Sequence, residues 1–162
     1  MDKQTEHAAS KTKVYLAGPV VTSKEYKGLV DEVCHRLRGW DALQVYRPGE
    51  HKVPNEWGIS QYVWGQCVFT MDVNAIDESD WVAVCDFGYN CTSIGTAWEC
   101  GYAFAKGKKI LVITMPGVER TSLMIDGCAS NIISFDDLKR PYWTVDDFLY
   151  ERGKKPEKKV LT

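Results

Sequence analysis

The segment from residue 81 to residue 113 constrains the fold more than any other part of this chain. Residues 81–85 (WVAVC) and 110–113 (ILVI) are short apolar runs, and a helical pattern lies between them at 93–107 (SIGTAWECGYAFAKG). Such apolar runs are typical of buried strands in a parallel sheet. Strand, helix and strand make a βαβ unit, in which ligands bind at the carboxyl ends of the strands, beside the helix N-termini. The segment thus predicts a parallel sheet and the position of a site.

Strands and helices alternate along the rest of the chain. Further strands are expected at 13–17, 43–46 and 131–135, and further helices at 24–38, 59–77 and 136–150. Alternation of this kind is typical of α/β proteins with a doubly wound sheet. We therefore predict an α/β fold with a mostly parallel, five-stranded sheet and helices on both faces.

Length and charge narrow the class of protein. The chain has 162 residues, enough for one domain with a substantial core. We expect that domain at 13–150, between a disordered tail at 1–12 and a basic tail at 151–162. The net charge of −2 argues against a surface that binds nucleic acid. No apolar run approaches the roughly 18 residues of a membrane span. The N-terminus lacks the apolar centre of a signal peptide, so we expect a cytoplasmic protein.

The spacing of cysteines and histidines predicts neither a metal site nor disulfide bonds, and we expect no cofactor. No two cysteines form a CxxC pair, and the histidines are scattered. Thiols of a cytoplasmic protein usually stay reduced and pack as small apolar groups. Cys91, in a loop near the expected site, is the one thiol that we expect could be reactive. The cysteines are Cys34, Cys67, Cys85, Cys91, Cys100 and Cys128, and the histidines are His7, His35 and His51.

Glu99 is the first candidate for a catalytic group. We expect it in the first turn of the helix at 93–107, where a carboxylate could act on a bound ligand. A structural alternative is open, because Thr96-Ala97-Trp98-Glu99 also matches a capping box. In a capping box, Glu99 would hydrogen-bond to the backbone of its own helix. Spacing by itself does not decide between the two.

Asp72 is the second candidate. On the predicted helix it shares a face with apolar side chains, namely Trp64, Val68, Ala75 and Ile76. An acidic residue in an apolar stripe is costly to bury without a partner. A partly desolvated carboxyl has a raised pKa and can serve as a proton donor. The alternative is that this face borders solvent or that Asp72 pairs with a basic residue.

Tyr15 is the third candidate. Because side chains alternate along a strand, Tyr15 points to the opposite face from Val14 and Leu16. Core packing would explain its presence. A tyrosine near the end of a strand could also hold a carboxylate by a hydrogen bond.

Taken together, these segments resemble the nucleoside 2-deoxyribosyltransferase family. The matching pieces are VYLAGP at 14–19, VWGQCVFTMDVNAI at 63–76, SDWVAV at 79–84, GTAWECGYAFAKGKKILVI at 95–113 and SLMIDGCASNII at 122–133. The resemblance implies a flavodoxin-like fold and an enzyme that acts on a small nucleoside or nucleotide and a free nucleobase. It also implies a homo-oligomer, dimer or hexamer, in which a neighbouring subunit completes each site.

The resemblance also implies roles for the three candidates. Glu99 would attack the anomeric carbon, Asp72 would handle the proton on the leaving base, and Tyr15 would orient Glu99. A deoxyribosyl ester on Glu99 would then pass to a second base or to water, with retention of stereochemistry. Because Glu99 must be ionised while Asp72 donates, we expect their environments to push the two pKa values apart. The expected substrate-binding residues are Gly18, Trp64, Ser93, Gly95, Ser122 and Met124.

Two serines depart from the pattern of the nucleoside-using members. Ser93 stands where those members usually have Asp, and Ser122, the residue expected from a neighbouring subunit, stands where they have Asn. The branch that acts on nucleoside 5′-monophosphates is similar to this chain at both places. An aspartate would repel a phosphate, whereas a serine hydroxyl can donate to one. Neutral loop variation is the alternative explanation.

Three functions are therefore open. The first is a nucleoside 2′-deoxyribosyltransferase, which the 63–76 helix favours. The second is a 2′-deoxynucleoside 5′-monophosphate N-glycosidase, which the two serines favour. Against the second, the expected phosphate contacts of the first loop are replaced here by Pro19 and Val21. The third, from a different class, is a flavodoxin-like binding domain without catalysis.

Overall fold

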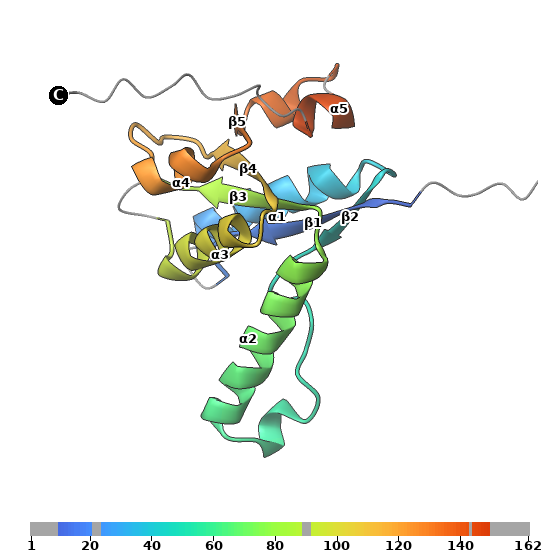
Figure 1. The fold of residues 1–162 in the computed structure, drawn as a ribbon, viewed down its shortest axis with the longest axis vertical. Coiled ribbons are helices and arrows are strands. Elements are labelled where there is room, and N and C mark those ends of the chain that lie inside the picture. The colour runs from blue at the N-terminus through green and yellow to red at the C-terminus, as the bar shows by residue number, and fades with distance from the viewer. Residues whose placement is uncertain (1–9, 21–23, 89–91, 143, 150–162) are drawn as a thin grey trace, which may run out of the picture.

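The centre of the molecule is a five-stranded sheet in which every neighbouring pair of strands is parallel (Figure 1). The computed structural model describes residues 10–20, 24–88, 92–142 and 144–149. The strand order is β2-β1-β3-β4-β5, so the chain reverses its direction of travel between β1 and β3. The strands are β1 (Thr12–Ala17), β2 (Leu43–Tyr46), β3 (Trp81–Asp86), β4 (Lys109–Thr114) and β5 (Asn131–Ser134). Ligands bind at the carboxyl ends of strands beside such a reversal.

Helices cover both faces of the sheet, and the α/β, flavodoxin-like fold predicted from the sequence is confirmed. One core layer packs α1 (Lys24–Arg38) and the C-terminal elements η2 (Asp137–Lys139) and α5 (Val145–Phe148) against the sheet. The other layer holds α3 (Ile94–Ala105), α4 (Leu123–Cys128) and the end of α2 (Gln61–Glu78). Val14 and Leu16 lie in the first layer and Tyr15 in the second, as strand alternation predicts.

The predicted βαβ unit is present and provides the middle of the sheet. Every residue of β3 is buried, which matches its continuous apolar sequence. Gly107 follows α3 with φ of +69°, the left-handed conformation with which helices often end. The unit therefore places the N-terminus of α3 at the carboxyl end of β3, beside the strand reversal.

Helix α2 leaves the body of the molecule, and only its C-terminal end lies against the sheet (Figure 1). Ile76, near that end, is its one buried residue. The segment from β2 to α2, which contains the short helix η1 (Glu56–Gly58), runs beside it. The apolar face predicted for α2 is therefore covered only toward its end, and Asp72 lies where the helix passes from solvent to core.

The prediction of one C-terminal helix at 136–150 is wrong. The structure has η2, a break, and the four-residue helix α5 instead. The break falls at Pro141, which has no N–H for a helix and pushes the preceding Arg140 to an extended ψ of 125°. Thr144 then begins α5 with a capping box. Its hydroxyl accepts a hydrogen bond from the backbone N–H of Asp147, and the Asp147 carboxylate accepts one from the backbone N–H of Thr144. The helix α4 was not predicted.

Some predictions fall outside the described residues. These are the reactive Cys91, residues 1–9 of the N-terminal tail and the whole C-terminal tail at 151–162. Among the described cysteines, Cys100 and Cys128 contact each other with Sγ atoms 3.2 Å apart, which is longer than a disulfide bond. None of the helices within the described ranges is long and apolar enough to cross a membrane.

Candidate active site

Two carboxylates meet at the carboxyl ends of β1 and β2, and each is held by a tyrosine. The hydroxyl of Tyr15 donates to Oε1 of Glu99 across 2.8 Å. The hydroxyl of Tyr46 donates to Oδ1 of Asp72 across 3.1 Å. The four side chains come from β1, β2, α2 and α3, so the cluster assembles only when these elements pack together.

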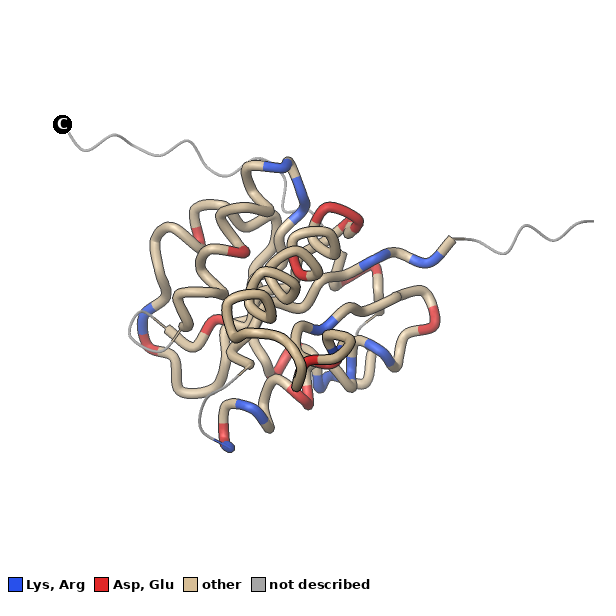
Figure 2. The backbone as a smooth tube through the Cα atoms, turned by 90° about the horizontal axis from the view of Figure 1, so that it is seen from below, with Lys and Arg blue, Asp and Glu red and all other residues tan. Residues whose placement is uncertain are grey.

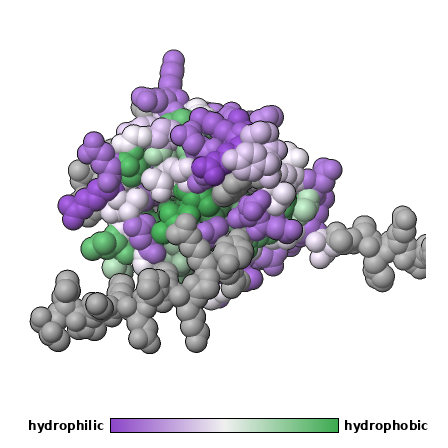
Figure 3. Space-filling model, turned by 90° about the horizontal axis from the view of Figure 1, so that it is seen from above, coloured by the Kyte–Doolittle hydropathy of each residue, from purple (hydrophilic) through white to green (hydrophobic). Residues whose placement is uncertain are grey.

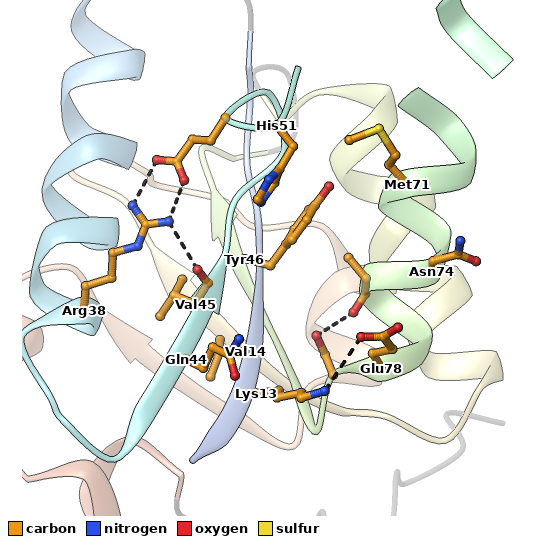
Figure 4. Close-up of a pocket in the computed structure, with 13 residues that line it drawn as sticks. Lys13, Val14, Arg38, Gln44, Val45, Tyr46, His51, Met71, Asn74 and Glu78 are labelled. Atoms are coloured by element: carbon orange, nitrogen blue, oxygen red, sulfur yellow. Dashed lines mark hydrogen bonds and ion pairs between the residues drawn. The ribbon is translucent and has the colours of Figure 1, made fainter. Parts of the chain in front are cut away.

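The two tyrosines are direct neighbours in the sheet. The register of the parallel pair β1–β2 places Tyr15 opposite Tyr46. Their rings stack with centroids 5.5 Å apart and an interplanar angle of 14°. On the other side of Tyr46, the ring of His51 stacks at 4.7 Å and 15°. Figure 4 shows Tyr46 between His51 and helix α2. Tyr15, Tyr46 and His51 thus form a column of stacked rings, and the hydroxyls of the two tyrosines each donate to one carboxylate.

Glu99 lies in the second turn of α3, and the prediction of the first turn is wrong. The helix begins at Ile94, and no acidic residue lies in its first turn. Its N-cap is Ser93, whose Oγ accepts a hydrogen bond from the backbone N–H of Thr96 at 3.0 Å. The capping box that starts at Thr96 is therefore not formed. Glu99 instead accepts a hydrogen bond from Tyr15 on β1, so its carboxylate lies by the carboxyl ends of the strands.

Burial raises the pKa of both carboxyls. The pKa of Glu99 rises to about 7, mainly because the group is desolvated; the hydrogen bond from Tyr15 lowers it, and the charge of Asp72 raises it further. Desolvation also raises the pKa of Asp72, while the hydrogen bond from Tyr46 and the charge of His51 lower it. Both pKa values thus move upward, and the expected difference between them remains a prediction.

Both tyrosines stay protonated donors over the whole neutral range. Desolvation and the neighbouring carboxylates raise the pKa of Tyr15 and of Tyr46 well above the usual value of a phenol. A phenol has one proton to donate, so each tyrosine serves one carboxylate. The arrangement can hold one carboxyl ionised and the other protonated at close range, which is what acid-assisted nucleophilic displacement requires.

The other predicted site residues lie in two groups. Gly18 follows β1 and is buried, and a Cβ there would meet the side chain of Val30 at 3.3 Å. Ser93 and Gly95 begin α3, and Ser122 is the N-cap residue of α4. In the chain these residues follow the carboxyl ends of β1, β3 and β4, and their predicted contact with substrate remains a prediction.

Trp64 and Met124 are not brought into this cluster. Trp64 is 41% exposed and lies two turns before Asp72 on α2, about 12 Å along the helix axis. Met124, on α4, is 83% exposed. Their predicted contact with substrate remains a prediction.

A pocket of about 510 Å³ lies between the edge strand β2 and helix α2 (Figure 4). Tyr46 and His51 line it, whereas Asp72 and Glu99 do not. The charges around it are paired: Lys13 with Glu78 at 3.7 Å and Arg38 with Glu50 at 2.5 Å. Arg38 also donates to the exposed carbonyl of Val45, which protects the sheet edge. Tyr46 therefore belongs both to this pocket and to the carboxylate cluster.

Tyr46 and His51 were missed by the sequence reasoning. A signal for Tyr46 was present, since it ends the second predicted strand just as Tyr15 lies near the end of the first. The carboxyl ends of neighbouring parallel strands lie at the same edge of a sheet, which would have paired the two tyrosines. His51 lies in a loop, and its position carries no such signal. Within the described ranges, no three His, Cys, Asp or Glu side chains gather as metal ligands would.

A family model described as nucleoside 2-deoxyribosyltransferase matches residues 14–141 of this chain. The match covers all four residues of the cluster and both serines. A search of curated proteins finds no match.

Solved structures share the fold. A 2-deoxyribosyltransferase from the psychrotolerant bacterium Bacillus psychrosaccharolyticus is 24% identical, with a TM-score of 0.66, over 87% of this chain and 99% of that one. A conserved protein from Enterococcus faecalis V583 is 16% identical, with a TM-score of 0.62, over 80% and 98%. The CMP N-glycosidase BcmB of Clostridium botulinum is 21% identical, with a TM-score of 0.52, over 79% and 93%.

The raised pKa of Glu99 predicts a pH-dependent loss of stability. Its folded pKa of about 7 exceeds the ordinary value of 4.5, so the folded state binds the proton more tightly than the unfolded state. Stability should therefore fall as the pH rises from about 4.5 to about 7. Glu99→Gln removes the charge and should stabilise the protein at pH 8 by on the order of 2 kcal/mol, with little gain at pH 4.5.

Urea denaturation at both pH values measures the difference. Glu119→Gln, at an exposed loop position, is the control and should be neutral at both. An equal gain for Glu99→Gln at the two pH values would contradict the raised pKa.

Proposed function

Because this chain belongs to the nucleoside 2-deoxyribosyltransferase family, we propose that it cleaves the N-glycosidic bond of 2′-deoxynucleosides and transfers the deoxyribosyl group to another base. The observation that carries the proposal is the pair of adjacent carboxylates, each held by a tyrosine. We place the catalytic unit in the single domain at 13–150.

In the first step of the proposed reaction, Glu99 acts as the nucleophile. Its ionised carboxylate attacks C1′, the bond between C1′ and the base breaks, and Asp72 gives its proton to the departing base. An ester between Glu99 and the deoxyribosyl group results. Tyr15 keeps the attacking carboxylate in place through its 2.8 Å hydrogen bond. Splitting one difficult displacement into two easier ones is the advantage of covalent catalysis.

In the second step, a nitrogen of the incoming base attacks C1′ and the ester bond breaks. Glu99 leaves as a carboxylate, and Asp72 accepts the proton of the incoming base. Two inversions give net retention, as in retaining glycosidases, whose two carboxyl groups are about 5–5.5 Å apart.

The second candidate is hydrolysis of 2′-deoxynucleoside 5′-monophosphates, with water in place of the incoming base. Ser93 favours it, because it caps a twelve-residue helix whose N-terminal N–H groups and dipole attract an anion. Its Oγ accepts from Thr96 N–H and lies 2.7 Å from the hydroxyl of Thr96. If the Thr96 hydroxyl donates in that contact, the Ser93 proton is available to a phosphate oxygen.

We also propose that the protein acts as a homo-oligomer. The N-terminal half of α2 exposes large apolar side chains, namely Tyr62, Val63, Trp64 and Phe69. Its sequence contains no Lys or Arg, and Figure 2 shows the basic residues dispersed among acidic ones on other parts of the chain. Figure 3 shows the opposite end of the molecule, where mainly hydrophilic residues surround an apolar area. A projecting apolar helix of this kind calls for burial against another subunit.

A substitution that adds a charge to α2 tests whether this helix forms the subunit interface. Tyr62 is 76% exposed, so Tyr62→Asp should leave the monomer folded but bury a charge in the subunit interface. We expect a wild-type mass of at least twice 18.4 kDa and an increase in the dissociation constant of at least about tenfold for the variant. Light scattering coupled to chromatography measures both.

The matched control for the oligomer is Tyr142→Asp. Tyr142 is 72% exposed and lies near the C-terminus rather than on α2. It should assemble like the wild type. A monomeric wild type, or equal effects of the two variants, would contradict an interface on α2.

The nucleophile is tested by Glu99→Ala. We expect release of free base from deoxyadenosine, in the presence of a second base, to fall at least ~10³-fold. Chromatography of the bases measures the rate, and circular dichroism checks that the variant is folded. Near-full activity in a folded variant would remove Glu99 as the nucleophile. A wild type that releases base from neither deoxyadenosine nor its 5′-monophosphate, and whose absorbance shows a bound flavin, would favour the non-catalytic binding domain.

Ser93→Asp separates the two enzyme candidates. Aspartate also caps helices well, so α3 should be retained while a negative charge is added. If Ser93 contacts a phosphate, the variant should lose at least about a hundredfold in kcat/KM on deoxyadenosine 5′-monophosphate, since two negative charges then face each other. Activity on deoxyadenosine should be kept or improved, because a carboxylate accepts well from a 5′-hydroxyl.

Ser93→Thr is the control for that change, since threonine caps the helix without adding a charge. It should act on both substrates at a similar ratio to the wild type. A wild type that ignores the monophosphate, together with no effect of Ser93→Asp on deoxyadenosine, would eliminate the phosphate role of Ser93.

A further inference from the structure

We propose that Tyr46 is a positioning residue which, in competition with its strand neighbour Tyr15, determines which of the two carboxyls holds a proton that they share. The inference rests on the proposed function, in which the productive form has Glu99 ionised and Asp72 protonated. It adds a residue that neither the family resemblance nor the sequence reasoning assigned.

The geometry joins the two carboxyls through one cross-strand pair. Tyr15 and Tyr46 are Cα partners in the β1–β2 register, and their rings lie almost parallel at 5.5 Å. Each ring ends in a hydroxyl that donates to a different carboxylate. Neighbouring parallel strands are about 4.8 Å apart, so the sheet itself sets the spacing of the two donors.

The two carboxyls do not ionise independently of each other. The charge of Asp72 raises the pKa of Glu99, and burial raises the pKa of both. Over a range of pH the pair therefore carries a single proton, and its titration belongs to the pair rather than to either residue. The proton can sit on Asp72, which is the productive form, or on Glu99, which is not. The two forms have the same net charge and differ only in the position of the proton.

The two tyrosines favour opposite forms. A hydrogen bond donated to a carboxylate stabilises its ionised state. Tyr15 donates to Glu99 and so favours the productive form, with the proton on Asp72. Tyr46 donates to Asp72 and so favours the form with the proton on Glu99. Tyr46 holds the acid in place, and its hydrogen bond also limits the fraction of the pair that is ready to react.

The groups that face the pair come from every element packed around it. Tyr15 is on β1, Tyr46 on β2, Asp72 on α2 and Glu99 on α3. His51 follows β2 and stacks on the outer side of Tyr46, and its positive charge lowers the pKa of Asp72. His51 therefore acts in the same direction as Tyr46.

The experiment compares pH profiles of kcat/KM for base release by the full-length wild type, Tyr46→Phe and Tyr15→Phe. Each phenylalanine keeps the ring stack and removes one donor. For Tyr46→Phe, we expect the maximum of the kcat/KM profile to rise by up to about tenfold, because a larger fraction of the singly protonated pair then has its proton on Asp72. For Tyr15→Phe, we expect the maximum of the profile to fall by a similar factor, because the proton then lies more often on Glu99.

A third tyrosine provides a matched control. Tyr102, on α3, also donates to an aspartate, at 3.0 Å to Oδ1 of Asp77, and also stacks on an aromatic ring, that of Trp98. This pair lies on the exposed part of the α2–α3 contact, about one helical turn after Glu99 on α3 and after Asp72 on α2. Tyr102→Phe should leave the maximum of the kcat/KM profile as it is in the wild type.

A second measurement does not depend on activity. Carbon-13 NMR of the side-chain carboxyls follows each titration directly, with Asp72→Asn and Glu99→Gln assigning the two signals. We expect the Asp72 midpoint to rise in Tyr46→Phe and the Glu99 midpoint to rise in Tyr15→Phe. Unchanged midpoints, or a change of the kcat/KM maximum in the same direction in both variants, would overturn the proposal. If the wild type cleaves no N-glycoside, the proposed function fails, and the NMR titrations still decide whether Tyr46 controls the proton.

Discussion

The site depends on one structural constraint, which is the register of β1 against β2. That register sets Tyr15 beside Tyr46, and each tyrosine holds one carboxylate from a helix on the same face of the sheet. A shift of one residue would turn either tyrosine to the opposite face, because side chains alternate along a strand. The buried core on both faces prevents such a shift. The core packing that stabilises the sheet therefore also fixes the geometry of the site.

The elements that carry the carboxylates differ in how firmly the core holds them. Helix α3 packs along the sheet and buries Thr96, Cys100 and Ala103, so Glu99 projects from a rigid support. Helix α2 is anchored only near Ile76, and its N-terminal half is apolar and exposed. Asp72 lies between the exposed half of α2 and its buried end. A subunit that covered α2 would fix Asp72 as well, which would link assembly to the chemistry of the site.

Local patterns predicted much of this molecule. The apolar runs of β3 and β4 and the alternation of β1 depend on whether each side chain faces the core, which neighbours in sequence report directly. The same patterns failed where a distant contact or a single residue decides. Pro141 split the C-terminal helix, and α4 is too short for its periodicity to stand out. Glu99 matched a local capping box, yet Tyr15, 84 residues away in sequence, provides its partner instead.

The sequence by itself determined the fold class and identified Glu99, Asp72 and Tyr15 as candidates. A carboxylate within an apolar pattern, or a tyrosine near the end of a predicted strand, can be recognised from its neighbours in sequence. Only the tertiary structure decided how these groups are paired. The ring column of Tyr15, Tyr46 and His51 joins two strands and a loop, and the charge of Asp72 raises the pKa of Glu99 only because two helices converge on this column. Hydrogen bonds and charges act over a few ångströms of space, and the sequence does not state which residues folding brings that close.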